Sequence, residues 1–174
     1  MIECATLAIL SPMRCSQASD GPLPGLLGGV VKLVWELLAA VDTGPFLDGT
    51  AARWGWPAVA ITDHGVVQAF PEAMNTARAL RKQGVDIKVI YGMEGYLVDS
   101  PDDPRAYHII FLAKNKTGLY NLYKLVSLSH IRYFRGTKKR GRPRIPRAVL
   151  QEYRAGLIVG SACEAGELIR GIVA

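Results

Sequence analysis

From residue 51 onward, short apolar runs alternate with segments of helical periodicity, and this alternation limits the possible folds more than any other feature of the chain. Four runs have the length of a strand: 57–62 (PAVAIT), 87–98 (IKVIYGMEGYLV), 107–113 (YHIIFLA) and 156–162 (GLIVGSA). Alternating strands and helices are typical of an α/β fold. The pattern therefore predicts strand and helix units around a parallel sheet.

The helical segments lie between or after these runs, at 70–83, 117–134, 145–153 and 165–172. Gly84 directly follows the first and Pro146 stands near the start of the third, as helix ends and starts prefer. The first 50 residues differ, because Gly and Pro are frequent there and the pattern suggests one helix, at 30–41. We expect an irregular segment 1–50 and an α/β domain 51–174.

Cysteine use and hydropathy favour a cytoplasmic protein. Cys4, Cys15 and Cys163 form no CxxC pair and no disulfide framework, which suits a reducing compartment. The apolar stretch 25–41 is interrupted by Lys32 and Glu36 and is shorter than the roughly 20 residues that a bilayer requires. We expect no membrane insertion.

Positive charge is concentrated in one segment. Residues 132–147 hold eight Lys or Arg and no acid, which leaves 21 − 8 = 13 bases against 15 acids elsewhere. Such a run, with Tyr133 and Phe134 beside it, is typical either of a nucleic-acid contact or of a solvated loop. The candidate nucleic-acid-binding residues are Arg135, Lys138, Lys139, Arg140, Arg142, Arg144 and Arg147.

Polar residues with metal-ligating chemistry follow several of the apolar runs. His64 follows the first, Glu94 lies late in the second, and Cys163 directly follows the fourth. Because the carboxyl ends of parallel strands meet at one mouth of a barrel, these side chains are candidates for a shared zinc-type site. Asp63 could orient His64 or stabilise the turn. Taken singly, each residue also has an ordinary structural explanation.

Four longer strings carry a resemblance to a known family: WGWPAVAITDHGVVQAFPEA, IKVIYGMEGYLVD, YHIIFLAKNKTGLYNLYKLVSLSHIRYF and PRIPRAVLQEYRAGLIVGSACEAGEL. In this order they resemble the PHP domain of PolC-type replicative DNA polymerases, over residues 51–168. The resemblance implies a distorted (β/α)7 TIM-like barrel with a metal cluster at the strand ends. It assigns ligand roles to His64, Glu94, His108 and Cys163, and it explains His108, which stands at a strand start.

Three departures from the family pattern suggest an incomplete barrel. Val30, Lys32 and Ala39 stand where the family has two His and an Asp, and Ala174 comes before the closing Asp-x-His string. Between Asp99 and Arg105 there is no inserted exonuclease. The resemblance then implies a site for one zinc or manganese ion, and neither polymerase nor exonuclease carboxylates.

The expected function is therefore that of a PHP-domain portion of a replicative polymerase, acting as a structural and metal-binding element without catalytic power of its own. DNA and the rest of the polymerase are the implied partners, and a partner chain could complete the barrel. Two alternatives remain open: a stand-alone PHP-type phosphoesterase or exonuclease, and a nucleic-acid-binding module that uses the basic segment.

Overall fold

The computed structural model describes residues 51–136 and 141–173. The chain divides into two compact units, Met1–Ile61 with Gln68–Ile90, and Thr62–Val67 with Tyr91–Ala174. The proposed irregular segment, including the expected helix at 30–41, lies outside the described residues, as do Lys138, Lys139 and Arg140. Within the described part of the chain, no helix is long and apolar enough to cross a bilayer.

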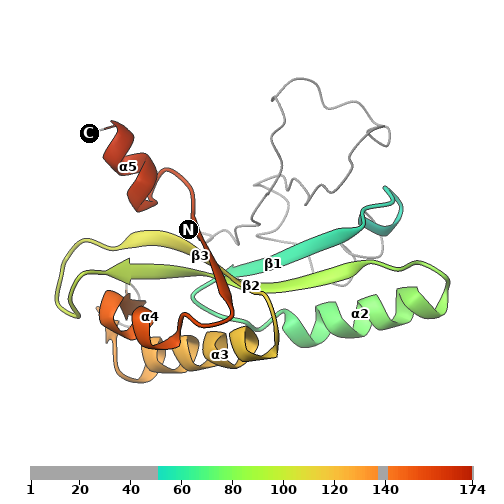
Figure 1. The fold of residues 1–174 in the computed structure, drawn as a ribbon, viewed down its shortest axis with the longest axis horizontal. Helices are drawn as coiled ribbons and strands as arrows, with labels where there is room; N and C mark the ends of the chain where they lie inside the picture. Colours follow the sequence, from blue (N-terminus) through green and yellow to red (C-terminus); the bar gives the residue numbers. More distant parts are fainter. Residues whose placement is uncertain (1–50, 137–140, 174) are drawn as a thin grey trace. The chain divides into compact units, whose positions relative to one another are not determined.

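The first unit contains helix α2, Phe70–Lys82 (Figure 1). Along the chain, α2 follows strand β1, Ala58–His64, and precedes strand β2, Lys88–Val98. Both strands extend into the second unit. Proline occupies the first turn of α2, where no backbone donor is needed, and Arg81 and Lys82 stand in its last turn beside the negative end of the helix dipole. Phe70, Ala73 and Leu80 form its buried face.

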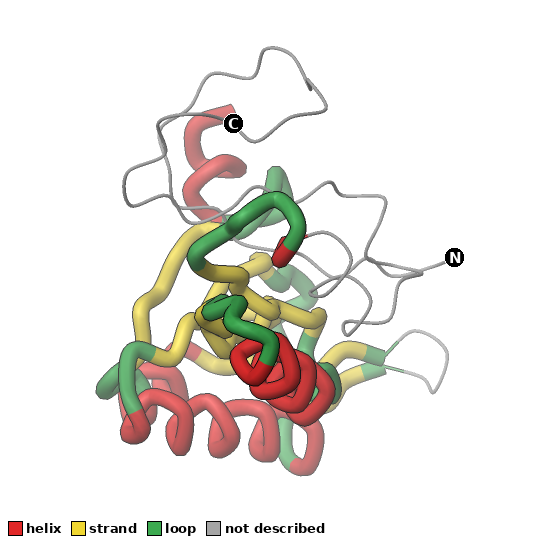
Figure 2. Tube along the Cα trace, turned by 90° about the vertical axis from the view of Figure 1, so that its right-hand side faces the viewer, coloured by secondary structure: helices red, strands yellow, loops and turns green. Residues whose placement is uncertain are grey.

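The second unit is built on a mixed sheet (Figures 1 and 2). Its strands are β2, β3 (Tyr107–Ala113), β4 (Phe134–Arg135), β5 (Arg142–Pro146) and β6 (Leu157–Ser161). Their order is β4-β5-β2-β3-β6, and β1 also pairs with β2.

The strand directions correct the prediction of a parallel sheet. Strand β2 is antiparallel to β3, and β3 is antiparallel to β6, whereas β2 and β5 are parallel. Only residues 99–106 separate β2 from β3, and a parallel connection needs roughly a dozen residues or more. The described residues thus form a mixed α/β fold.

Three helices belong to the second unit. Helix α3, Lys116–Ile131, contacts β3, β5, β6 and α4, which is Arg147–Tyr153. Helix α5, Glu167–Val173, contacts β3 and β6. Asn115 caps α3, because its side-chain oxygen accepts a hydrogen bond from the Gly118 amide at 2.9 Å. Leu122 and Leu125 anchor α3 in the core, where they are completely buried.

Within residues 51–136 and 141–173, the positions of the predicted strands and helices are confirmed, apart from shifts of a few residues at their ends. Strands β4 and β5 were missed, because Phe134 ends the helix expected at 117–134, residues 142–144 lie in the expected basic loop, and Ile145 and Pro146 begin the helix expected at 145–153. Two prolines and two arginines give β5 an unfavourable strand composition. Pairing with β2 and the burial of Ile145 make it a strand nevertheless.

Candidate metal centre

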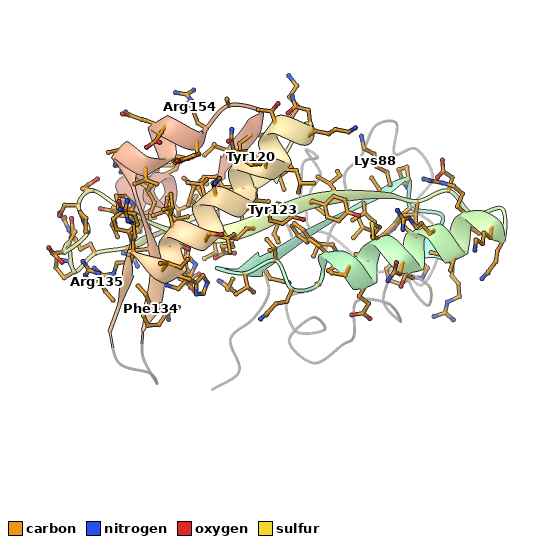
Figure 3. All side chains as sticks on the ribbon, turned by 90° about the horizontal axis from the view of Figure 1, so that it is seen from below. Lys88, Tyr120, Tyr123, Phe134, Arg135 and Arg154 are labelled. Atoms are coloured by element: carbon orange, nitrogen blue, oxygen red, sulfur yellow. The ribbon has the colours of Figure 1, made fainter. Side chains whose placement is uncertain are left out.

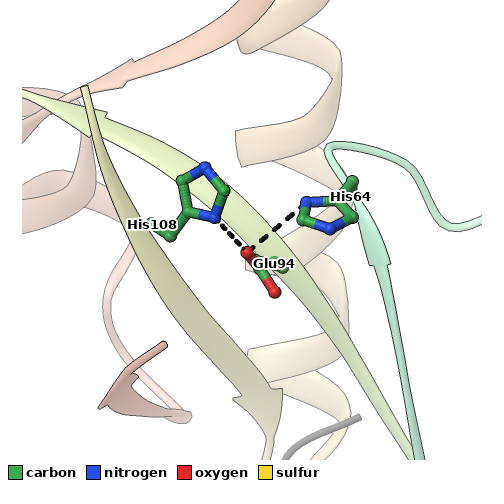
Figure 4. Close-up of side chains that lie close together, drawn as sticks. All are labelled: His64, Glu94 and His108. Carbon is green, nitrogen blue, oxygen red and sulfur yellow. Dashed lines mark ion pairs between the residues drawn. The ribbon is translucent and has the colours of Figure 1, made fainter. Parts of the chain in front are cut away.

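Three side chains from three strands of the second unit converge on one point (Figure 4). His64 ends β1, Glu94 lies in β2 and His108 in β3, and each offers one ligand atom within 4.8 Å of the others. Glu94 is completely buried, whereas the side chains of the two histidines are 14% and 21% exposed. A ligand at this point would be enclosed on the carboxylate side and reachable on the imidazole side.

The sheet register explains why Glu94 and His108 meet. Tyr96 is the antiparallel partner of His108, and Glu94 is the partner of Ile110. Because side chains alternate along a strand, Glu94, Tyr96 and His108 lie on one face, with His108 diagonal to Glu94. Antiparallel pairing therefore places a residue from the start of β3 beside one from the middle of β2, which the expectation of parallel strands did not predict.

The turn after His64 is fixed by backbone contacts. The amide of Gly65 donates a hydrogen bond to the carbonyl oxygen of Glu94 at 2.7 Å. Gly65 has a φ of 68°, and a Cβ there would lie 2.6 Å from Cγ of Pro143, so only glycine fits without displacement. Nε2 of His130 lies 2.8 Å from the Gly65 carbonyl oxygen, which ties the end of α3 to this turn.

The distances between the candidate ligand atoms resemble those around a tetrahedral metal ion. Nδ1 of His64 lies 3.4 Å from Oε1 of Glu94, and Sγ of Cys163 lies 3.6 Å from Nδ1 of His108. Zinc-like bond lengths imply about 3.4 Å between nitrogen and oxygen ligands and about 3.6 Å between nitrogen and sulfur. Nδ1 of His108 is closer to Oε1, at 2.5 Å, so these two atoms would separate by about 1 Å to share an ion.

Cys163 is near the cluster without belonging to it. The group of mutually close ligand atoms contains His64, Glu94 and His108, and Cys163 approaches it through His108. Asp63 precedes His64 in β1 and is half-buried. Its role in orienting His64 and the ligand role of Cys163 stay predictions.

The burial of the Glu94 carboxylate, without regular hydrogen bonds, indicates that the cluster fits a cation. Neither carboxylate oxygen has a hydrogen bond of regular geometry within the described part of the chain, and both are buried. A buried charge without compensation costs several kcal/mol, and a divalent cation is an effective compensation for it. Two imidazoles and one carboxylate are also a donor set that zinc and manganese accept.

Tyr96 and Arg142 are two neighbours of the cluster that the sequence reasoning missed. The Tyr96 hydroxyl lies 3.4 Å from Nδ1 of His64 and accepts a hydrogen bond of 2.7 Å from Arg142. The Tyr96 ring stacks on His64 and meets His108 edge-on. The sequence could have indicated Tyr96, because it stands two residues after Glu94 and therefore lies on the same face of the strand.

Most of the described basic candidates have partners inside the protein. Arg135 pairs with Asp102 at 3.1 Å, and Arg144 donates to the carbonyl oxygen of Asp103 at 2.5 Å. Arg147 is held between Asp99 and Glu167. Hydrogen bonds to Asp99 and then Glu167 raise the pKa of the Arg147 guanidinium above its usual value. These arginines fasten the turn after β2 to the β4–β5 ribbon.

A cavity of about 260 Å³ lies next to His108 but belongs to the other face of the sheet. Tyr107, Ile109, Val159 and Ser161 line it, together with Leu168 of α5. Ile109 pairs with Ser161 in the register, and both alternate with the residues that face Glu94. His108 also lines the cavity and is shared with the candidate metal centre, whereas the residues named above lie on the other face of the sheet.

The fold and the cluster together define an α/β domain with a metal-type site on a mixed sheet. The chain belongs to the PHP domain family, whose family model matches residues 40–173.

Several curated relatives share the same region. The DNA polymerase III PolC-type of Clostridium perfringens is 55% identical over 114 residues, which are 61% of this chain and 8% of that protein. The protein of the same name from Bacillus subtilis is 55% identical over 69 residues, 40% of this chain and 4% of the relative. That of Caldanaerobacter subterraneus is 38% identical over 114 residues, again 61% and 8%. The chain thus spans less than a tenth of the length of these relatives.

Proposed function

We propose that this chain serves as a metal-binding structural PHP domain in the context of a PolC-type replicative DNA polymerase. The observation that carries the proposal is the buried, unsatisfied carboxylate of Glu94 between two histidines. The relatives of this chain are named DNA polymerase III PolC-type. We therefore propose DNA and the remaining polymerase segments as its partners, and the cytoplasm as its location.

His64, Glu94 and His108 would hold one zinc or manganese ion, with Cys163 as a fourth ligand after a small movement. Such an ion, when bound, supplies charge compensation and cross-links three strands. The side chains contribute orientation, because Glu94 is fixed by burial and the Tyr96 ring stacks on His64. The sheet would be part of an incomplete (β/α)7 barrel, and the residues before 40, where the family match begins, would lie outside the PHP core.

Metal analysis of the purified 174-residue chain tests this proposal. After dialysis against zinc or manganese, we expect about one bound ion per chain, as a three-residue site predicts. His64→Ala and Glu94→Gln should remove it, whereas Glu72→Gln, an exposed acid on α2, should not. Equal metal content in Glu94→Gln and the unsubstituted chain would refute the assignment.

Activity assays separate a structural role from an enzymatic one. We expect no release of phosphate from a phosphomonoester, no release of nucleotide from DNA, and no nucleotide incorporation by the chain alone. Metal-dependent hydrolysis that His64→Ala abolishes would replace the structural role by that of a PHP-type phosphoesterase.

A further inference from the structure

The exposed face of helix α3 is both aromatic and cationic. Lys116, Tyr120, Tyr123 and Lys124 stand at positions i, i+4, i+7 and i+8, which is one face of a helix. Tyr120 and Tyr123 are 58% and 44% exposed, and both project from the solvent side of α3 (Figure 3). The Lys124 ammonium lies 5.3 Å from the centre of the Tyr120 ring. We refer to these four residues as the α3 face.

The charge around this face has one sign. The 48 residues from 104 to 151 hold 12 of the 21 Lys and Arg residues and not one Asp or Glu. Arginines of this stretch form ion pairs inside the protein, as Arg135 of β4 does with Asp102 and Arg147 of α4 does with Asp99. In the described ranges, Lys116 and Lys124 form no ion pair, and their charge is directed to solvent.

One acid and one further cation lie beyond the C-terminal end of this stretch. Glu152 on α4 accepts a hydrogen bond from Tyr153, and this bond is the main cause that raises the pKa of Tyr153. Arg154 follows on the same segment and is exposed (Figure 3). The pair adds no net charge, so the positive charge of the α3 face comes from Lys116 and Lys124.

We propose that the α3 face is a binding surface for single-stranded nucleic acid. Two exposed tyrosine rings one helical turn apart offer stacking platforms for unpaired bases, and the flanking lysines meet the phosphates. The stacking requires bases whose faces are accessible, which a duplex does not offer. The surface is distinct from the basic ribbon and from the metal centre, and the inference does not depend on a bound ion.

Binding of the full chain to a fluorescent oligothymidylate of about 16 nucleotides, followed by anisotropy, tests this surface. We expect Tyr120→Ala and Tyr123→Ala each to weaken binding about 5-fold or more, while Tyr120→Phe keeps the affinity because it keeps the ring. Lys116→Gln with Lys124→Gln should flatten the salt dependence between about 50 and about 200 mM. Leu168→Ala and Lys82→Gln, both exposed elsewhere, are the controls and should bind normally.

Three results would overturn the inference. The first is no binding of the oligothymidylate at low salt. The second is salt-dependent binding that the tyrosine substitutions leave unchanged, which would assign the contact to the basic ribbon. The third is tighter binding of duplex than of single strand. An oligouridylate run in parallel shows whether DNA or RNA is preferred, and weaker binding of both by Tyr120→Ala supports the surface in either case.

Discussion

Replacing Glu94 by Gln separates the two roles that the buried carboxylate can have. Glu94 is a completely buried carboxyl group whose oxygens lack regular hydrogen bonds, and the ring nitrogens nearest to it are those of His108 at 2.5 Å and His64 at 3.4 Å. Burying a charge costs several kcal/mol, and nearby imidazoles offset part of that cost. The neutral, nearly isosteric glutamine should therefore leave the metal-free chain as stable as before, or more stable by about 1–2 kcal/mol.

Bound metal should make the unsubstituted chain more stable than Glu94→Gln. At about 100 times the dissociation constant, binding stabilises the native state by about 2.7 kcal/mol. A chain of this size shifts its Tm by about 2–4 °C per kcal/mol, so the expected rise is about 5–11 °C. If Glu94→Gln weakens binding about 100-fold, the same metal concentration adds only about 0.4 kcal/mol, or about 1–2 °C.

Thermal melts followed by circular dichroism, in chelator and in zinc or manganese, measure both effects, with the exposed Glu72→Gln variant as the control. A Glu94→Gln variant that melts lower than the unsubstituted chain in chelator would show that Glu94 already has adequate partners. An equal metal-induced rise in both proteins would show that the ion, if any, binds elsewhere. Either result refutes the reasoning from the unsatisfied carboxylate.

Three further substitutions test other parts of the structure. Tyr96→Phe removes a hydroxyl that contacts Nδ1 of His64, the atom that would ligate an ion, and keeps the ring that stacks on His64, so metal affinity in a calorimetric titration should be equal or higher; a clear loss of affinity would show that Nδ1 is not the ligand atom. Gly118→Ala places a Cβ against the Gly156 carbonyl and should lower the free energy of unfolding in urea by about 1–3 kcal/mol, whereas Gly171→Ala in α5 meets no atom and should cost nothing. Arg147→Ala breaks two partly exposed ion pairs and should cost about 1 kcal/mol, less at high salt; an additive double-mutant cycle with Asp99→Asn would contradict that coupling.

The candidate cluster shows how far residue chemistry leads without a fold. His64, Glu94 and His108 were identified by a family resemblance and by their ligand chemistry, and the structure brings these three together. For His108 the reason is the antiparallel pairing of β3 with β2, which the expectation of parallel strands did not predict. The place of Tyr96 beside the cluster, and that of Arg142, which was assigned only to nucleic acid, depend on which strands lie beside β2.

For the basic segment 132–147, residue chemistry alone did not identify the contacts that its arginines make. Its charge is evident from composition, but the described arginines that were assigned to nucleic acid have partners in the protein, such as Asp102 for Arg135. Most of those partners lie more than 30 residues earlier in the chain, and Glu167, the second partner of Arg147, lies 20 residues later. Local sequence cannot reveal them, because an ion pair is a property of two surfaces that meet only on folding.

By itself, the sequence determined where β1, β2, β3, β6 and the four described helices lie, because hydrophobic periodicity and helix ends are local properties of the chain. It also determined membership in the PHP family, because the matching strings are long and in order. Only the tertiary structure decided the strand directions, the burial of Glu94 and the charge left exposed on α3. These depend on contacts between distant residues, whose free energies are settled when the sheet assembles and not before.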